Sequence, residues 1–112
     1  MTTRLYTHPI YLEHLTSLGH PERPDRLRAI ERVLAEEQFE DLDRREAPMG
    51  DEETILYAHP GGHLQAVRAR IPETGLANID SDTTVSPKSW QAALTAIGAA
   101  NDKGERTVLT LL

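Results

Sequence analysis

The chain has 112 residues, with 12 basic and 18 acidic side chains and a formal net charge of −6. This length suits one domain or part of one, and an acidic surface argues against nucleic acid as a partner, because phosphate-binding surfaces are basic. The absence of cysteine excludes a disulfide framework and a thiolate metal site. No apolar run approaches the ~18 residues of a membrane span, and the first residues lack the apolar core of a signal peptide, so we expect a cytoplasmic protein.

A short strand and a helix are the first predicted elements. Residues 3–7, TRLYT, favour an extended conformation. A helix is predicted from Pro24, which suits the first helical position, through Phe39. The following residues 40–50 are polar and are expected to be irregular, ending in a turn. The expected core face of the helix comes from apolar residues at helical spacing: Leu27, Ile30, Val33 and Leu34.

Three further helices are predicted in the second half of the chain. Asp51 suits the cap of a helix over residues 52–59. A short helix is expected over 63–71, and a longer one over 87–101 with Ser86 as its cap and Pro87 in its first turn. The inward residues of the last helix are expected to be Trp90, Ala93, Leu94 and Ile97.

Extended pieces are rarer than helices in this sequence. One is predicted near Ile79, and another in the final TVLTLL run, which follows a charged turn. Two or three short strands make a poor independent sheet. We therefore expect a single incomplete α/β domain over residues 1–112, mostly helical with one to three short strands, whose remaining strands are missing.

The stretch GHPERPDRL, residues 19–27, is unusually dense in proline, acid, arginine and histidine. Its HPERPDRL part resembles the H-P-E-x-P-x-R-L motif of the histone deacetylase family, which includes bacterial acetylpolyamine amidohydrolases and deacetylase-like amidohydrolases. Residues 11–24, 55–67 and 79–100 resemble further family segments in the same order, so the likeness spans about residues 3–100. The resemblance implies an arginase/deacetylase-like domain with a parallel central sheet. It also implies a zinc-dependent deacylase that hydrolyses acetyl-lysine or acetylpolyamine amides.

Individual residue roles follow from this resemblance. Arg26 matches the arginine beside the family's internal channel, where a guanidinium suits a carboxylate product; from the sequence alone it could equally pair with a nearby acid. Asp80 resembles the rim aspartate that accepts hydrogen bonds from substrate N–H groups, and Asp82 competes for that role. The same DSDT stretch also suits a turn in which an aspartate bonds its own backbone. Four motif residues are interpreted as structural: His20, Pro21, Glu22 and Pro24.

The departures from the family are equally specific. The G-H-H and D-x-H motifs that carry acid–base and zinc-binding residues in the family are absent from this sequence. Residues 101–112 do not resemble the family's continuation, so we expect a truncated chain with no catalytic residue and no cofactor of its own, zinc belonging to the intact enzyme. Its partner would be an acylated lysine or polyamine once the missing part completes the site.

Two other features of the sequence suggest different functions. His59 and His63 have the H-x-x-x-H spacing of a helical metal pair, but the intervening Pro-Gly-Gly disrupts a helix and no glutamate accompanies them. We therefore predict no metal site there. The alternative function is a small acidic helical module that binds another protein through an exposed apolar helix face and has no catalytic activity.

Overall fold

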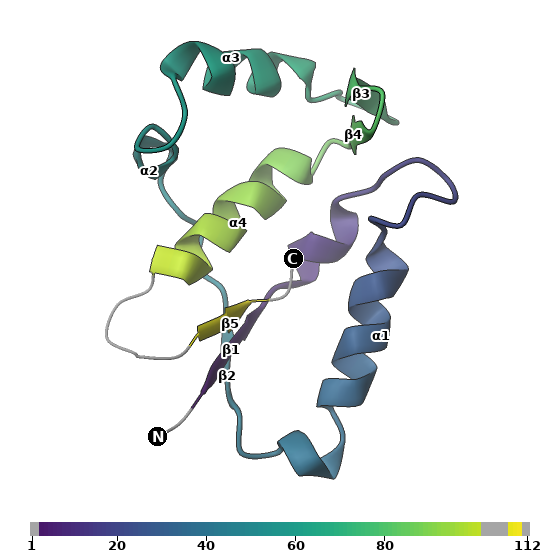
Figure 1. Ribbon diagram of the computed structural model, residues 1–112, viewed down its shortest axis with the longest axis vertical. Helices are drawn as coiled ribbons and strands as arrows, with labels where there is room; N and C mark the ends of the chain where they lie inside the picture. Colours follow the sequence, from purple (N-terminus) through teal and green to yellow (C-terminus); the bar gives the residue numbers. More distant parts are fainter. Residues whose placement is uncertain (1–2, 102–107, 111–112) are drawn as a thin grey trace.

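The computed structural model describes residues 3–101 and 108–110, which form both helices and strands (Figure 1). Strand β1 (Arg4–Thr7) lies between β2 (Asp43–Glu46) and β5 (Val108–Thr110), and both neighbours run parallel to it. A separate antiparallel pair joins β3 (Ala77–Asp80) to β4 (Thr83–Val85). The helical elements are the 3₁₀ turns η1 (Pro9–Glu13) and η2 (Glu37–Phe39) and the α-helices α1 (Pro24–Leu34), α2 (Glu52–Ile55), α3 (Gly61–Arg70) and α4 (Ser89–Asn101). The α/β class is as expected, but the described residues form five strands, so the expected one to three was too few.

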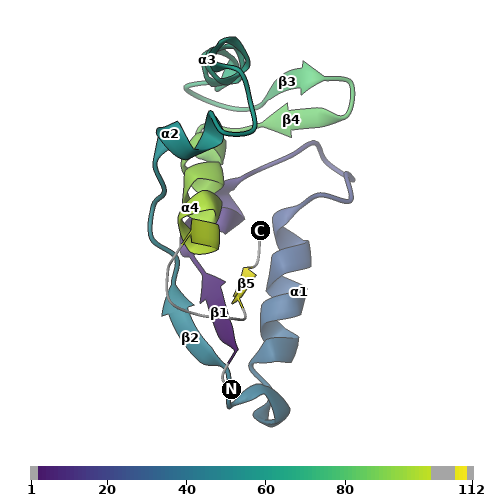
Figure 2. The same ribbon diagram turned by 60° about the vertical axis from the view of Figure 1, so that its left-hand side comes forward.

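The core surrounds β1 at the centre of the three-stranded sheet. Leu5 and Tyr6 are 2% and 1% exposed. Successive side chains of a strand point to opposite faces, so their shared burial shows that the sheet is covered on both sides at this strand. Helix α1 flanks the sheet in both views, and α4 packs on η1 and β5 (Figures 1 and 2). The buried apolar cluster comprises Leu5, Tyr6, Tyr11, Leu27, Ala47, Ala92 and Ala99.

Strand β2 is the element that the sequence analysis missed. Its residues, DRRE, are polar and largely exposed, and residues 40–50 were expected to be irregular. The backbone nevertheless pairs with β1, beginning with Asp43 N–H donating to the Thr3 carbonyl at 2.9 Å and ending with Ala47 N–H donating to the Thr7 carbonyl at 2.9 Å. Pairing across about forty residues is a tertiary effect, which side-chain periodicity within the segment does not reveal.

Helix α1 begins at Pro24 as predicted but ends earlier than predicted. The α-helix stops at Leu34, and a separate 3₁₀ turn covers the last part of the predicted span up to Phe39. Leu27 is buried at 4% exposure, whereas Val33 is 48% exposed and does not belong to the core face. At 100° per residue Val33 lies about 120° around the helix from Leu27, so it points away from the core.

Helix α4 presents its apolar residues in two directions. Leu94 is buried as expected, but Trp90 and Ile97 are half-buried and Ala93 is exposed, so this part of the expected inward face was wrong. The more deeply buried side includes Ala92 and Ala99, which join the main core. A helix that is apolar around most of its circumference does not reveal from its sequence which side meets the sheet.

The close approach of the 48–50 segment to α4 depends on glycine. Gly50 N–H donates to the Leu94 carbonyl at 2.8 Å, and a Cβ at Gly98 would overlap the Pro48 carbonyl. Only a residue without a side chain allows the two backbones to meet this closely.

The two helices between β2 and β3 are displaced from their predicted bounds. Asp51 caps α2 as expected, because its Oδ1 accepts from Glu53 N–H at 3.0 Å, but α2 ends at Ile55 and not at residue 59. Helix α3 starts at Gly61, two residues before the predicted start. The glycines after Pro60 therefore open the next helix, since Pro60 sits at its N-cap.

Candidate functional site

The loop that carries the HPERPDRL motif is fastened to the β3–β4 turn by His20. Its Nε2 lies 2.9 Å from Oδ1 of Asp82, a residue 62 positions later in the chain. Its Nδ1 accepts the backbone N–H of Glu22 at 3.0 Å. Because Nδ1 accepts a hydrogen bond, the neutral ring carries its proton on Nε2 and donates it to Asp82.

The bond to Asp82 also changes the acid–base behaviour of His20. A carboxylate that accepts from the ring favours the protonated imidazole, so it raises the pKa of His20 above its ordinary value. The motif loop and the aspartate turn are thereby linked by a contact whose strength depends on the protonation of one ring. His20 thus contacts both the neighbouring backbone at Glu22 and the side chain of Asp82.

Asp80 is the last residue of β3 and Asp82 is the second residue of the two-residue turn that follows, and the two side chains make different bonds. Oδ1 of Asp80 accepts the backbone N–H of Asp82 at 2.9 Å, and with Thr83 this lowers the pKa of Asp80 below its ordinary value. That is the local turn bond that the DSDT stretch suggested. Asp82 holds His20 while its side chain remains 89% exposed. Both residues are exposed, but the Asp80 side chain is engaged by the turn backbone, whereas Asp82 bonds across to His20.

A buried serine connects the approach to the motif with the start of α4. Ser86 is 0% exposed; its Oγ donates to the Glu13 carbonyl and accepts Leu15 N–H, each at 2.8 Å. Beside it, Ser89 Oγ accepts Ser86 N–H at 2.8 Å and shares a 2.6 Å hydrogen bond with Nδ1 of His14. Ser86 was expected to cap α4; its carbonyl accepts the backbone N–H of Ser89 at 3.0 Å, while its hydroxyl holds the 13–15 segment.

Two further features complete this contact between distant segments. Ser17 and Thr84 share a hydroxyl–hydroxyl hydrogen bond of 2.8 Å, which ties the loop to β4. Burial lowers the pKa of His14, and the nearby Glu22 carboxylate opposes that shift only in part. The sequence analysis did not single out Ser17, Thr84 or Ser89; isolated hydroxyls carry no spacing signal that distinguishes them from surface residues.

Arg26 lies at the start of α1, on the motif side of the molecule. Its Nη2 donates to Glu22 Oε1 at 3.3 Å, and the two side chains are 36% and 47% exposed. The structure thus contains the pairing with a nearby acid that the sequence allowed. Pro24 occupies the first turn of α1.

The histidine pair His59 and His63 makes no hydrogen bond to His20, Asp80 or Asp82 among the contacts described above. Their ring centroids are 5.2 Å apart with an interplanar angle of 32°. Over residues 3–101 and 108–110, no group of three or more histidine or carboxylate side chains is arranged to hold a metal ion. In the same part of the chain, no helix combines the length and apolar character needed to cross a bilayer.

These observations define an α/β chain in which a proline-rich loop, a carboxylate-bearing hairpin turn and the start of a helix are held together by side-chain hydrogen bonds. The chain matches the family described as the histone deacetylase domain over residues 20–109. It therefore belongs to the histone deacetylase family, as the HPERPDRL and DSDT stretches indicated. The matched range ends within the 101–112 segment, which the sequence analysis set apart from the family. No curated protein matches the chain.

Proposed function

We propose that this chain supplies the substrate-facing loops of a zinc-dependent deacylase that hydrolyses acetyl-lysine or acetylpolyamine amides. Membership of the histone deacetylase family supports the deacetylase class. The two substrates have in common an amide N–H beside a carbonyl, and a carboxylate at the rim of a site accepts such a donor. The parallel β2-β1-β5 strands would belong to the larger central sheet of the family fold.

The observation that carries this proposal is the contact between His20 and Asp82. It joins the two sequence stretches that most resemble the family, although 62 positions separate them. A carboxylate that must orient a substrate needs a fixed position, and the bond from Nε2 provides one at 2.9 Å. One oxygen of Asp82 is engaged in this way, which leaves the other to accept a substrate N–H.

We assign the substrate contact to Asp82 in preference to Asp80. The local N–H bond of Asp80 closes the hairpin turn, so moving this side chain toward a ligand would open the turn. Asp82 can take a further donor without losing its His20 bond, because a carboxylate has about four acceptor positions and this side chain is 89% exposed.

Arg26 is proposed as the channel arginine of the completed enzyme, with Glu22 as its resting partner. The pair is half-exposed, so a carboxylate product entering beside α1 would compete with Glu22 for the guanidinium. We assign no zinc ligand to the described residues, because they contain no cluster of side chains that fits a metal ion. A cytoplasmic location also remains part of the proposal.

The test is substrate binding to the ¹⁵N-labelled chain, followed by amide chemical shifts. An acetyl-lysine peptide and an acetylated diamine should each shift the amides of residues 80–83 in a saturable manner. Asp82→Asn should weaken binding about three- to tenfold, since a hydrogen bond to an exposed charged group is worth less than the ~1.5–3 kcal/mol of a buried one.

The matched control is Asp25→Asn, which alters an exposed carboxylate that pairs with Arg28 on α1. This variant should bind as the wild type does. Equal weakening by Asp25→Asn would show only a general charge effect, and an absence of saturable shifts at the turn would refute the proposed role of Asp82.

A further inference from the structure

A cavity of about 450 Å³ lies between α2, α3 and α4, and none of His20, Asp80 and Asp82 lines it. Its volume falls within the ~300–1,000 Å³ typical of small-molecule sites. Most of its lining is apolar: Ile55, Ala58, Leu64, Val67, Ile71, Val85, Trp90, Ala93 and Ile97. Its size and composition suit the apolar body of a small ligand.

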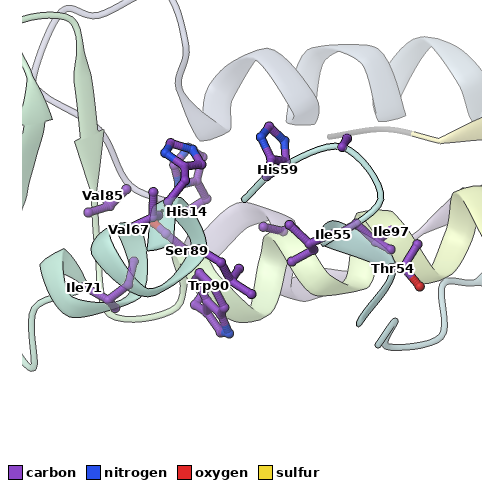
Figure 3. Close-up of a pocket in the computed structure, with 14 residues that line it drawn as sticks. His14, Thr54, Ile55, His59, Val67, Ile71, Val85, Ser89, Trp90 and Ile97 are labelled. Atoms are coloured by element: carbon purple, nitrogen blue, oxygen red, sulfur yellow. Dashed lines mark hydrogen bonds between the residues drawn. The ribbon is translucent and has the colours of Figure 1, made fainter. Parts of the chain in front are cut away.

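The polar groups of this cavity are few, and all of them are neutral hydrogen-bond donors or can become cationic. They are the imidazoles of His14, His59 and His63 and the hydroxyls of Thr54 and Ser89. Figure 3 shows the rings of His14 and His59 along one edge, with Trp90 on the opposite side. Each of these groups can donate a hydrogen bond. Among the described lining residues there is no carboxylate to pair with a cationic ligand.

The histidines differ in their surroundings. His14 is half-buried, its Nδ1 is engaged by Ser89, and burial lowers its pKa, so it favours the neutral form. His59 and His63 are exposed, with ring centroids 5.2 Å apart. The inner part of the cavity is therefore uncharged, while a pair of imidazoles at the rim can approach one head group together.

We propose that this cavity binds an aliphatic monocarboxylate, with its chain among Ile55, Val67 and Trp90 and its carboxylate at the His59–His63 rim. A carboxylate accepts hydrogen bonds through two oxygens and donates none, which matches two imidazole N–H donors. An alkylammonium of equal length would find no acidic partner among the described lining residues. This site is separate from the proposed substrate rim and needs no metal.

Trp90 provides a reporter, because it lines the cavity and is the only tryptophan in the sequence. Titration of the full chain with hexanoate, octanoate and decanoate, below the concentrations at which they aggregate, should change its fluorescence saturably. Affinity should rise about fourfold for each CH₂ buried, until the cavity is filled. Octylamine should bind at least tenfold more weakly than octanoate. Equal binding of octylamine, or no saturable change, would overturn the proposal.

Two variants test the position of each part of the ligand. Ala93→Phe places a ring in the cavity and should abolish octanoate binding, whereas Ala29→Phe, at an exposed position of α1, should not. Combined replacement of His59 and His63 by alanine should weaken octanoate about tenfold but leave octanol unchanged.

Retention of octanoate binding in Ala93→Phe would contradict the assigned cavity, and an equal loss for octanol would contradict the assigned rim. Should Ala93→Phe fail to fold, amide shifts of the wild-type chain decide the matter. Shifts confined to α2, α3, α4 and the neighbourhood of the lining residues His14 and Val85 support the site, and shifts elsewhere refute it.

Discussion

Replacement of Ser86 by alanine tests whether the loop that carries the family motif is held by one buried hydroxyl. Ser86 is 0% exposed, and its Oγ has two backbone partners at 2.8 Å, the Glu13 carbonyl and the Leu15 N–H. Alanine leaves both partners without this bond. Each net hydrogen bond contributes ~1 kcal/mol, and Glu13 and Leu15 are exposed residues whose backbone groups can recruit water, so we expect a loss of about 2 kcal/mol.

Urea unfolding of wild type and Ser86→Ala measures this difference in the free energy of unfolding. Ser81→Ala, at an exposed turn position, is the control and should stay within about 0.5 kcal/mol of wild type. Hydrogen exchange offers a local readout: the Leu15 amide should exchange about 30-fold faster in Ser86→Ala, the factor that corresponds to 2 kcal/mol. A loss below about 0.5 kcal/mol together with unchanged exchange at Leu15 would refute the reasoning.

Three further predictions follow from the geometry. Asp82→Asn should lower the pKa of His20 toward its ordinary value, which NMR titration of the ring measures. In the wild type the pKa of His20 is raised on folding. The contact therefore stabilises the fold fully below the unfolded pKa of about 6.5, and this stabilisation is lost as the pH rises through the higher folded-state pKa. An unchanged His20 titration would contradict the contact. Gly98→Ala should cost about 1–3 kcal/mol by thermal unfolding, because its methyl group meets the Pro48 carbonyl; Gly62→Ala, with open space in α3, should instead stabilise by up to about 1 kcal/mol, and equal effects of the two would show that the contact is not tight. If the proposed function is right, the purified chain with added zinc should not hydrolyse an acetyl-lysine substrate, because its sequence carries neither the G-H-H nor the D-x-H motif; turnover abolished by a chelator would disprove this.

The elements that the sequence located well are those with a local physical cause. Proline at the first position of α1 and Asp51 at the cap of α2 act within a few residues, so their effects can be predicted without the tertiary structure. The HPERPDRL stretch likewise identified the family, which the match over residues 20–109 confirms. The ends of helices were less predictable: α1 and α2 both stop before their predicted ends, because fraying and turns depend on what the last residues pack against.

The sequence by itself determined the family, the α/β class and the starts of α1 and α2, since each depends on a contiguous motif or on a cap within one helical turn. Tertiary structure alone decided the pairing of the polar strand β2, the bond from His20 to Asp82 and the placing of Ser86 beneath the loop. It also decided which side of α4 faces the core and which faces the cavity. These outcomes depend on groups that are far apart in the chain, and a hydrogen bond or a packed surface forms only where folding brings both partners together.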